Sequence, residues 1–201
     1  PLWFISKYVP EEKFSTGFVE GVRCFKGLKA ITSCEGALQY FSTTIVPIYA
    51  LLFLKTNLEV GFFLGYLGLV GFVIAIFLSN RSDKTQKRKG HIFILFLLMV
   101  LSIIGLSLAK NSAVWYLAVG IFTIIYTVSS PLRLAVSLDV RKADISFWKT
   151  REFFLNIGRV TTLSMAMIFF AFELYPWVFA LFGIIALAYP FLVHYKLKEI
   201  Q

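Results

Sequence analysis

The chain has 201 residues, of which 58% are hydrophobic and only 15% charged, and its formal net charge is +9. A soluble domain is roughly half apolar and about a quarter charged, so the composition excludes an ordinary soluble domain. Its apolar residues form continuous runs of about 20, the length with which a helix crosses a hydrocarbon core, whereas barrel strands alternate in polarity over about ten residues. The sequence therefore predicts an all-α membrane protein.

Six apolar runs follow one another and predict six transmembrane helices. They lie near residues 31–54, 59–79, 92–109, 113–132, 152–172 and 176–194. The segment 1–30 before them is expected to be a cytoplasmic linker. Apolar residues at helical spacing within it, such as Phe14, Phe18 and Val22, fit either an interfacial amphipathic helix or a plain linker. Residues 31–195 thus form a six-helix bundle, and 196–201 a cytoplasmic tail.

Basic residues are concentrated on one side of these spans. Five lysines and arginines precede the first span, five follow the second and five lie between the fourth and fifth, whereas the opposite side carries Lys55 and Lys110. The positive-inside rule places both termini in the cytoplasm. The net charge is then explained by topology and contact with anionic membrane lipids, and no nucleic-acid partner is expected.

A charged loop between the second and third spans carries a family resemblance. Residues 79–88 read SNRSDKTQKR and resemble the cytoplasmic G-x-x-x-D-[RK]-x-G-R-[RK] loop of the major facilitator superfamily, with both glycines replaced. The positions that match its charged residues are Asp83, Lys84, Lys87 and Arg88. The resemblance implies a cytoplasmic gating loop, with Asp83 as a latch; an ordinary basic loop is the alternative.

Two further stretches resemble the same family. CEGALQYFSTTIVPIYA, residues 34–50, is similar to the first helix of carboxy-terminal halves, and REFFLNIGR, residues 151–159, to a fifth-helix signature of bacterial members. The resemblance implies the carboxy-terminal six-helix half of a twelve-helix transporter, whose partner is a missing amino-terminal half. Its expected function is secondary active transport of a small solute by alternating access, coupled to a proton or cation, in a bacterial-type plasma membrane.

Glu35 is the most informative acid of the first span. Gln39, Ser42 and Thr43 follow it at helical spacing and form one polar stripe on an apolar helix. Such a stripe normally faces a bundle interior or a water-filled cavity, so these four residues are candidates for a solute or ion pathway. Glu35 either carries a proton or a cation during transport, or lies close enough to the surface to be solvated.

Arg159 is the most costly residue of the fifth span, because a guanidinium inside a membrane costs about 2.5–3.5 kcal/mol on insertion scales. Glu152 and Asn156 lie on the same helical face and are predicted to contact it. Arg159 and Asn156 are therefore candidates for binding a substrate anion. The alternative is a structural ion pair.

The fourth and second spans add two weaker patterns. Thr123, Tyr126 and Thr127 share a face that either lines a cavity or bonds to neighbouring backbone. Gly61 and Gly65 begin a small-residue face on the second span that predicts close helix contact.

Catalytic and metal-binding motifs are not recognised in the sequence. His91 and His194 lie at distant span ends, and neither forms metal-ligand spacing with Cys24 or Cys34. We therefore expect no enzyme, no cofactor and no metal. The alternative to transport is a self-contained six-span membrane scaffold or assembly protein.

Overall fold

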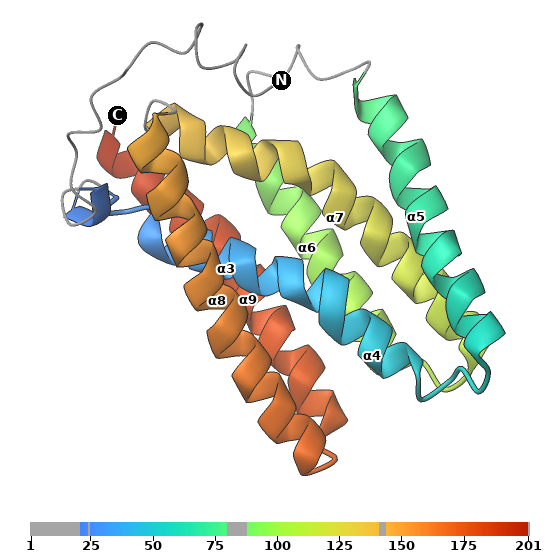
Figure 1. Cartoon of the computed structure of the whole chain (residues 1–201). Coiled ribbons are helices and arrows are strands. Elements are labelled where there is room, and N and C mark those ends of the chain that lie inside the picture. Colours follow the sequence, from blue (N-terminus) through green and yellow to red (C-terminus); the bar gives the residue numbers. More distant parts are fainter. Residues whose placement is uncertain (1–20, 24, 80–87, 141–143, 201) are drawn as a thin grey trace, which may run out of the picture.

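The computed structural model describes the backbone of residues 21–23, 25–79, 88–140 and 144–200. The secondary structure in this part of the chain is entirely helical (Figure 1). The elements are α3 (Lys29–Tyr40), the π-helix η1 (Phe41–Ile45), α4 (Val46–Ala50), α5 (Asn57–Ser79), α6 (Arg88–Ser107), α7 (Ser112–Val140), α8 (Ile145–Ala171) and α9 (Tyr175–Ile200).

Five helices, α5 to α9, are long and apolar enough to cross a membrane. Their outward faces carry large apolar side chains, including Leu58, Phe62 and Phe72, each at least 65% exposed. A continuous apolar surface of this kind is unfavourable in water and is expected against lipid. The prediction of an all-α integral membrane protein is confirmed at this level.

The first predicted span, 31–54, is helical but divided, and its helix ends at Ala50 rather than at residue 54. α3, η1 and α4 have 12, 5 and 5 residues and follow one another without a break. Pro47 lies at the start of α4, where its ring would clash with the carbonyl of Thr43 in a regular α-helix. The wider π-turn before it relieves that clash, so no single piece reaches the length of a span.

The helices of the fourth and fifth predicted spans extend beyond the predicted bounds of those spans. The fourth span was expected to end near residue 132, but α7 continues through Pro131 to Val140. The fifth was expected to begin near residue 152, but α8 starts at Ile145, where the Asp144 carboxylate accepts a hydrogen bond from the Phe147 amide. Proline is tolerated inside a membrane helix because neighbouring groups satisfy the freed carbonyl. As a result, Arg133 and Arg151, assigned to a loop by sequence, lie within helices.

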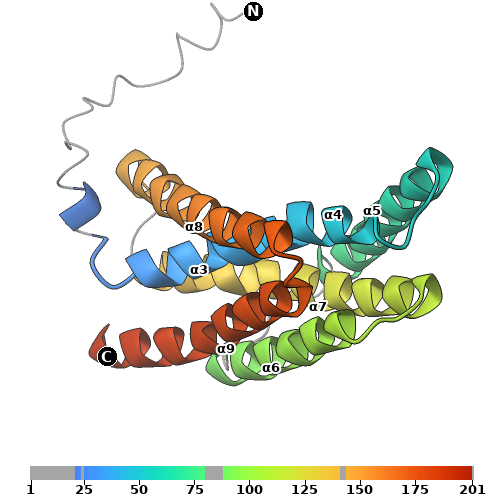
Figure 2. The same ribbon diagram turned by 90° about the horizontal axis from the view of Figure 1, so that it is seen from below.

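The helices pair in a pattern with internal symmetry. The main contacts join α3 to α8 and to α9, α7 to α5 and to α6, and α6 to α9. If α3 to α4, α5 and α6 are exchanged for α7, α8 and α9 in that order, the α3–α8 pair becomes α7–α5 and the α3–α9 pair becomes α7–α6. Figure 2 shows the result: α5 and α8 flank α3, α4 and α7 on one side, while α6 and α9 lie together on the other.

Aromatic side chains fill the centre of the bundle. Phe41 in η1 is fully buried, with its ring edge-on to Phe122 at 5.2 Å and its centroid 4.5 Å from that of Phe182. Phe96 and Tyr189 stack in parallel at 4.2 Å between α6 and α9. These rings hold α3, α7 and α9 around a common core and so fix the polar residues next to it.

Candidate functional site

The polar site is built where α3 crosses α8. A Cβ atom added to Gly36 would lie 2.1 Å from the Leu155 carbonyl oxygen, and one added to Gly158 would lie 1.9 Å from the Ser33 carbonyl oxygen. The Ser33 hydroxyl donates a hydrogen bond to the Phe154 carbonyl across the same crossing (3.2 Å). The two backbones therefore touch, which only glycine at both positions permits.

Sequence reasoning predicted this kind of close contact on α5 instead. Added Cβ atoms at Gly61, Gly65, Gly68 and Gly71 meet nothing within 4 Å in the described part of the chain. Within that part, the small-residue face of α5 is therefore open. The intimate contact of α5 is made on a different face, where the Tyr66 ring packs against Gly120 of α7 and its hydroxyl donates to the Tyr116 carbonyl at 3.3 Å.

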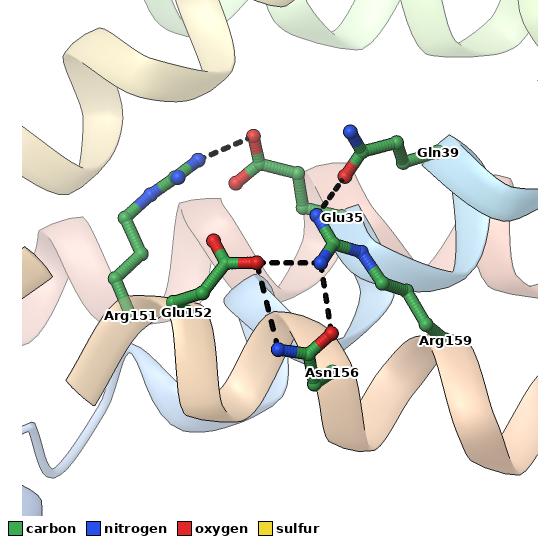
Figure 3. Close-up of polar contacts among 6 residues, drawn as sticks. All are labelled: Glu35, Gln39, Arg151, Glu152, Asn156 and Arg159. Carbon is green, nitrogen blue, oxygen red and sulfur yellow. Dashed lines mark hydrogen bonds and ion pairs between the residues drawn. The ribbon is translucent and has the colours of Figure 1, made fainter. Parts of the chain in front are cut away.

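The α3–α8 crossing brings together two ion pairs, both drawn in Figure 3. Arg151 Nη2 lies 2.6 Å from Glu35 Oε1, and each of these side chains is only 12% exposed. One turn or two farther along, Arg159 Nη1 donates to Glu152 Oε1 at 2.5 Å and Arg159 Nη2 to Gln39 Oε1 at 2.6 Å. Arg151 thus joins α8 to Glu35 of α3, and Arg159 joins α8 to Gln39 of α3.

Asn156 completes the Arg159 cluster. Its Oδ1 accepts from Arg159 Nη1 at 2.8 Å, and its Nδ2 contacts Glu152 Oε1 at 3.5 Å. The predicted contact of Arg159 with Glu152 and Asn156 is therefore present. Glu35 of α3 pairs with Arg151 rather than with Arg159.

A cavity of about 470 Å³ opens between α3, α7 and α8. It is polar on the side of the two ion pairs, and aromatic and aliphatic side chains line the rest of it. Its lining residues are Glu35, Gln39, Tyr126, Ser130, Pro131, Arg133, Leu134, Trp148, Arg151, Glu152, Leu155 and Arg159. Three arginines and two glutamates give this lining a net charge of +1.

Arg133 is the least expected member of this lining. Its side chain is 2% exposed, and its guanidinium carbon lies 4.2 Å from the centre of the Tyr126 ring. Nε and Nη1 of Arg133 have no hydrogen-bond partner among the described residues. The Tyr189 hydroxyl, within electrostatic range of Arg133, is also buried without a partner in that same part of the chain. Unsatisfied buried donors of this kind are rare and require an explanation.

Several residues predicted from sequence converge on this cavity, and others do not. Glu35, Gln39, Tyr126 and Arg159 line it, and Asn156 supports Arg159. The predicted residues that do not line the cavity are Ser42 and Thr43 in η1 and Thr123 and Thr127 in α7. The Thr43 hydroxyl donates a hydrogen bond back to the Gln39 carbonyl at 3.0 Å.

The predicted gating loop falls largely beyond the described residues. Asp83, Lys84 and Lys87 lie outside them, as does the side chain of Arg88, whose backbone begins α6.

Sequence reasoning missed Arg133, Arg151 and Trp148 as site residues. The two arginines were counted among the basic residues of a cytoplasmic loop, because the fourth span was expected to end near residue 132 and the fifth to begin near residue 152. A signal was present: Tyr126, Ser130 and Arg133 follow one another at helical spacing and share one face if the helix continues through the proline.

Comparison of the chain with protein-family models, with curated proteins and with solved structures finds no match. Among the described residues, no group of three or more histidine, cysteine, aspartate or glutamate side chains is arranged to hold a metal ion. The functional conclusion therefore depends on the site itself.

Proposed function

We propose that the protein is a secondary active transporter of a small solute, and that this chain forms a six-helix half of major facilitator type. The observation that carries the proposal is the charged cavity between α3, α7 and α8, embedded in an otherwise apolar bundle. Ionisable groups inside a membrane bundle are costly and normally mark a pathway for ions or solutes. Five of them line one cavity here.

The pairing pattern of the helices supports the proposed family. Each half of a major facilitator transporter contains two three-helix repeats in inverted orientation. The α3–α8 and α7–α5 pairs, and the α3–α9 and α7–α6 pairs, are what such a repeat predicts. In this proposal α3, η1 and α4 together form the first of six spans, since 22 residues of helix extend over about 33 Å.

A second half would cover the side of the bundle on which α5 and α8 stand apart. The open small-residue face of α5, with Gly61, Gly65 and Gly68, suits close packing against a helix of that half. Alternating access would then result from one half rocking against the other around the cavity. Both termini of this chain would be cytoplasmic, as the distribution of basic residues indicates.

The ion pairs give the proposed cycle a physical basis. Arg159 bonds to Glu152 and Asn156 on its own helix and to Gln39 on α3, so movement of α3 against α8 changes only the last bond. Glu35 is the acid at the interface that would exchange Arg151 for a proton or a cation.

Solute flux in proteoliposomes tests the proposal. The complete reading frame that contains this chain is reconstituted, and a panel of labelled solutes is offered with an imposed proton or sodium gradient. We expect gradient-driven uptake of at least one class of solute, which Arg159→Gln removes and Lys110→Gln, at an exposed loop position, retains. Absence of flux for every class, together with an upstream frame that encodes no spans, would instead favour the six-span scaffold.

A further inference from the structure

The cavity holds one more positive charge than its carboxylates balance, and that charge is on Arg133. Arg151 is paired with Glu35 and Arg159 with Glu152. Among the described residues, no carboxylate is paired with Arg133. Resting on the proposed transport function, we infer that the cavity binds a small organic monocarboxylate, with Arg133 as the residue that contacts the carboxylate group.

Burial makes the free charge of Arg133 significant. Its guanidinium cannot be deprotonated in a protein, so it stays charged although the residue is only 2% exposed. The face of the Tyr126 ring, 4.2 Å from the guanidinium carbon, offsets part of the energetic cost of burying this charge through a cation–π interaction. A ring face accepts no conventional hydrogen bond, so the N–H groups on Nε and Nη1 still lack acceptors. A bound anion in the cavity would supply the missing charge, and it would supply the missing acceptors once a shift of the Arg133 side chain exposes these two buried nitrogens.

The charge balance selects a singly charged ligand. The net charge of +1 on the lining is neutralised by one negative charge, whereas a dianion would leave a buried charge of the opposite sign. The planar guanidinium fork of arginine matches the two oxygens of a carboxylate.

The remaining walls select an organic ligand over an inorganic ion. Tyr126 and Trp148 supply aromatic surface, and Leu134 and Leu155 supply aliphatic surface around the same cavity. A volume of about 470 Å³ lies in the range of small-molecule sites and far exceeds that needed for a halide. The carboxylate group would therefore contact Arg133 while its apolar part packs on these side chains.

A purely structural role for Arg133 makes the opposite prediction for stability. An arginine that stabilises the fold through a partner is destabilising to remove, whereas a buried charge without a partner costs stability as long as the site is empty. We therefore expect Arg133→Met, similar in length and apolar, to unfold at the same or a higher temperature than the unsubstituted protein when no ligand is present.

The test measures thermal unfolding and calorimetric binding of the detergent-purified protein. The probes are lactate, benzoate and hexanoate, each compared with its neutral amide, and phosphatidylglycerol as an anionic lipid. At least one carboxylate is expected to raise the unfolding temperature of the unsubstituted protein and of Lys110→Gln, and its amide is not. Arg133→Met is expected to lose about tenfold or more in affinity for the carboxylate. Arg133→Lys keeps the positive charge but not the planar guanidinium group, so its loss of affinity is expected to be smaller.

Four results would overturn the inference. They are no response to any carboxylate, an unchanged response in Arg133→Met, stabilisation by phosphatidylglycerol alone, and a lower unfolding temperature of unliganded Arg133→Met. Flux measurements separate this inference from the proposed function. If a carboxylate binds in an Arg133-dependent way but no solute is transported, the transport function is contradicted. If another solute is transported but no carboxylate binds, only the carboxylate site is contradicted.

Discussion

Replacing Gly158 by alanine is expected to separate α3 from α8. The new Cβ atom would lie 1.9 Å from the Ser33 carbonyl oxygen, whereas real Cβ atoms essentially never come closer than 3.0 Å. The obstacle is backbone rather than a flexible side chain, so the helices must move apart by about an ångström. Overpacking of this kind costs about 1–3 kcal/mol in free energy of unfolding, more than the ~1 kcal/mol that alanine gains over glycine in a helix.

The same displacement reaches the polar site. If the side chains keep their conformations, the 2.6 Å bond between Arg159 Nη2 and Gln39 Oε1 lengthens to about 3.6 Å, beyond hydrogen-bonding range. Gly183→Ala in the middle of α9 is the matched control, because its added Cβ atom meets nothing within 4 Å in the described part of the chain. Chemical denaturation in mixed micelles, followed by tryptophan fluorescence, measures both variants. A Gly158→Ala protein as stable as Gly183→Ala would refute the close crossing of α3 and α8.

Two further predictions concern Glu35. Glu35→Gln leaves Arg151 partly buried without its carboxylate and should lower the free energy of unfolding by up to about 3 kcal/mol. Glu35→Gln combined with Arg151→Met should recover much of that loss. If the losses of the two substitutions simply add in the same denaturation assay, the two side chains do not act as a pair. In proteoliposomes, Glu35→Gln should also flatten the dependence of solute uptake on an imposed proton gradient, and an unchanged dependence would remove Glu35 from the coupling step.

Hydropathy and helical periodicity were enough to predict the membrane class, the polar face that carries Glu35 and Gln39 on one helix, and the polar face that carries Arg159 on another. Apolar runs report burial in lipid directly, and residues three, four or seven apart share a face whatever the tertiary structure. For this reason the contact of Arg159 with Glu152 and Asn156, which lies within one helix, was predictable. The sixth span and the family of transporters stay predictions.

What the sequence did not reveal depends on contacts between helices. Arg133 was hidden by Pro131, which ends helices in water but not in a bundle whose neighbours satisfy the freed carbonyl. Gly36 and Gly158 lie 122 residues apart, and nothing local distinguishes them from the glycines of α5, whose small-residue face stays open in the described part of the chain. The pairing of Arg151 with Glu35 follows from that crossing and could not be predicted before it was known.

The central claim is that the cavity between α3, α7 and α8 is a water-accessible pathway inside the membrane. Its most direct test is the rate at which a charged, membrane-impermeant methanethiosulfonate modifies Ser130→Cys in membranes, with Cys24 and Cys34 replaced by serine. Ser130 lines the cavity, whereas Leu117 on the same helix is 66% exposed on the apolar surface. The account predicts rapid modification of Ser130→Cys and very slow modification of Leu117→Cys, because thiols ionise and react in water rather than in lipid. Equal rates at the two positions would contradict it.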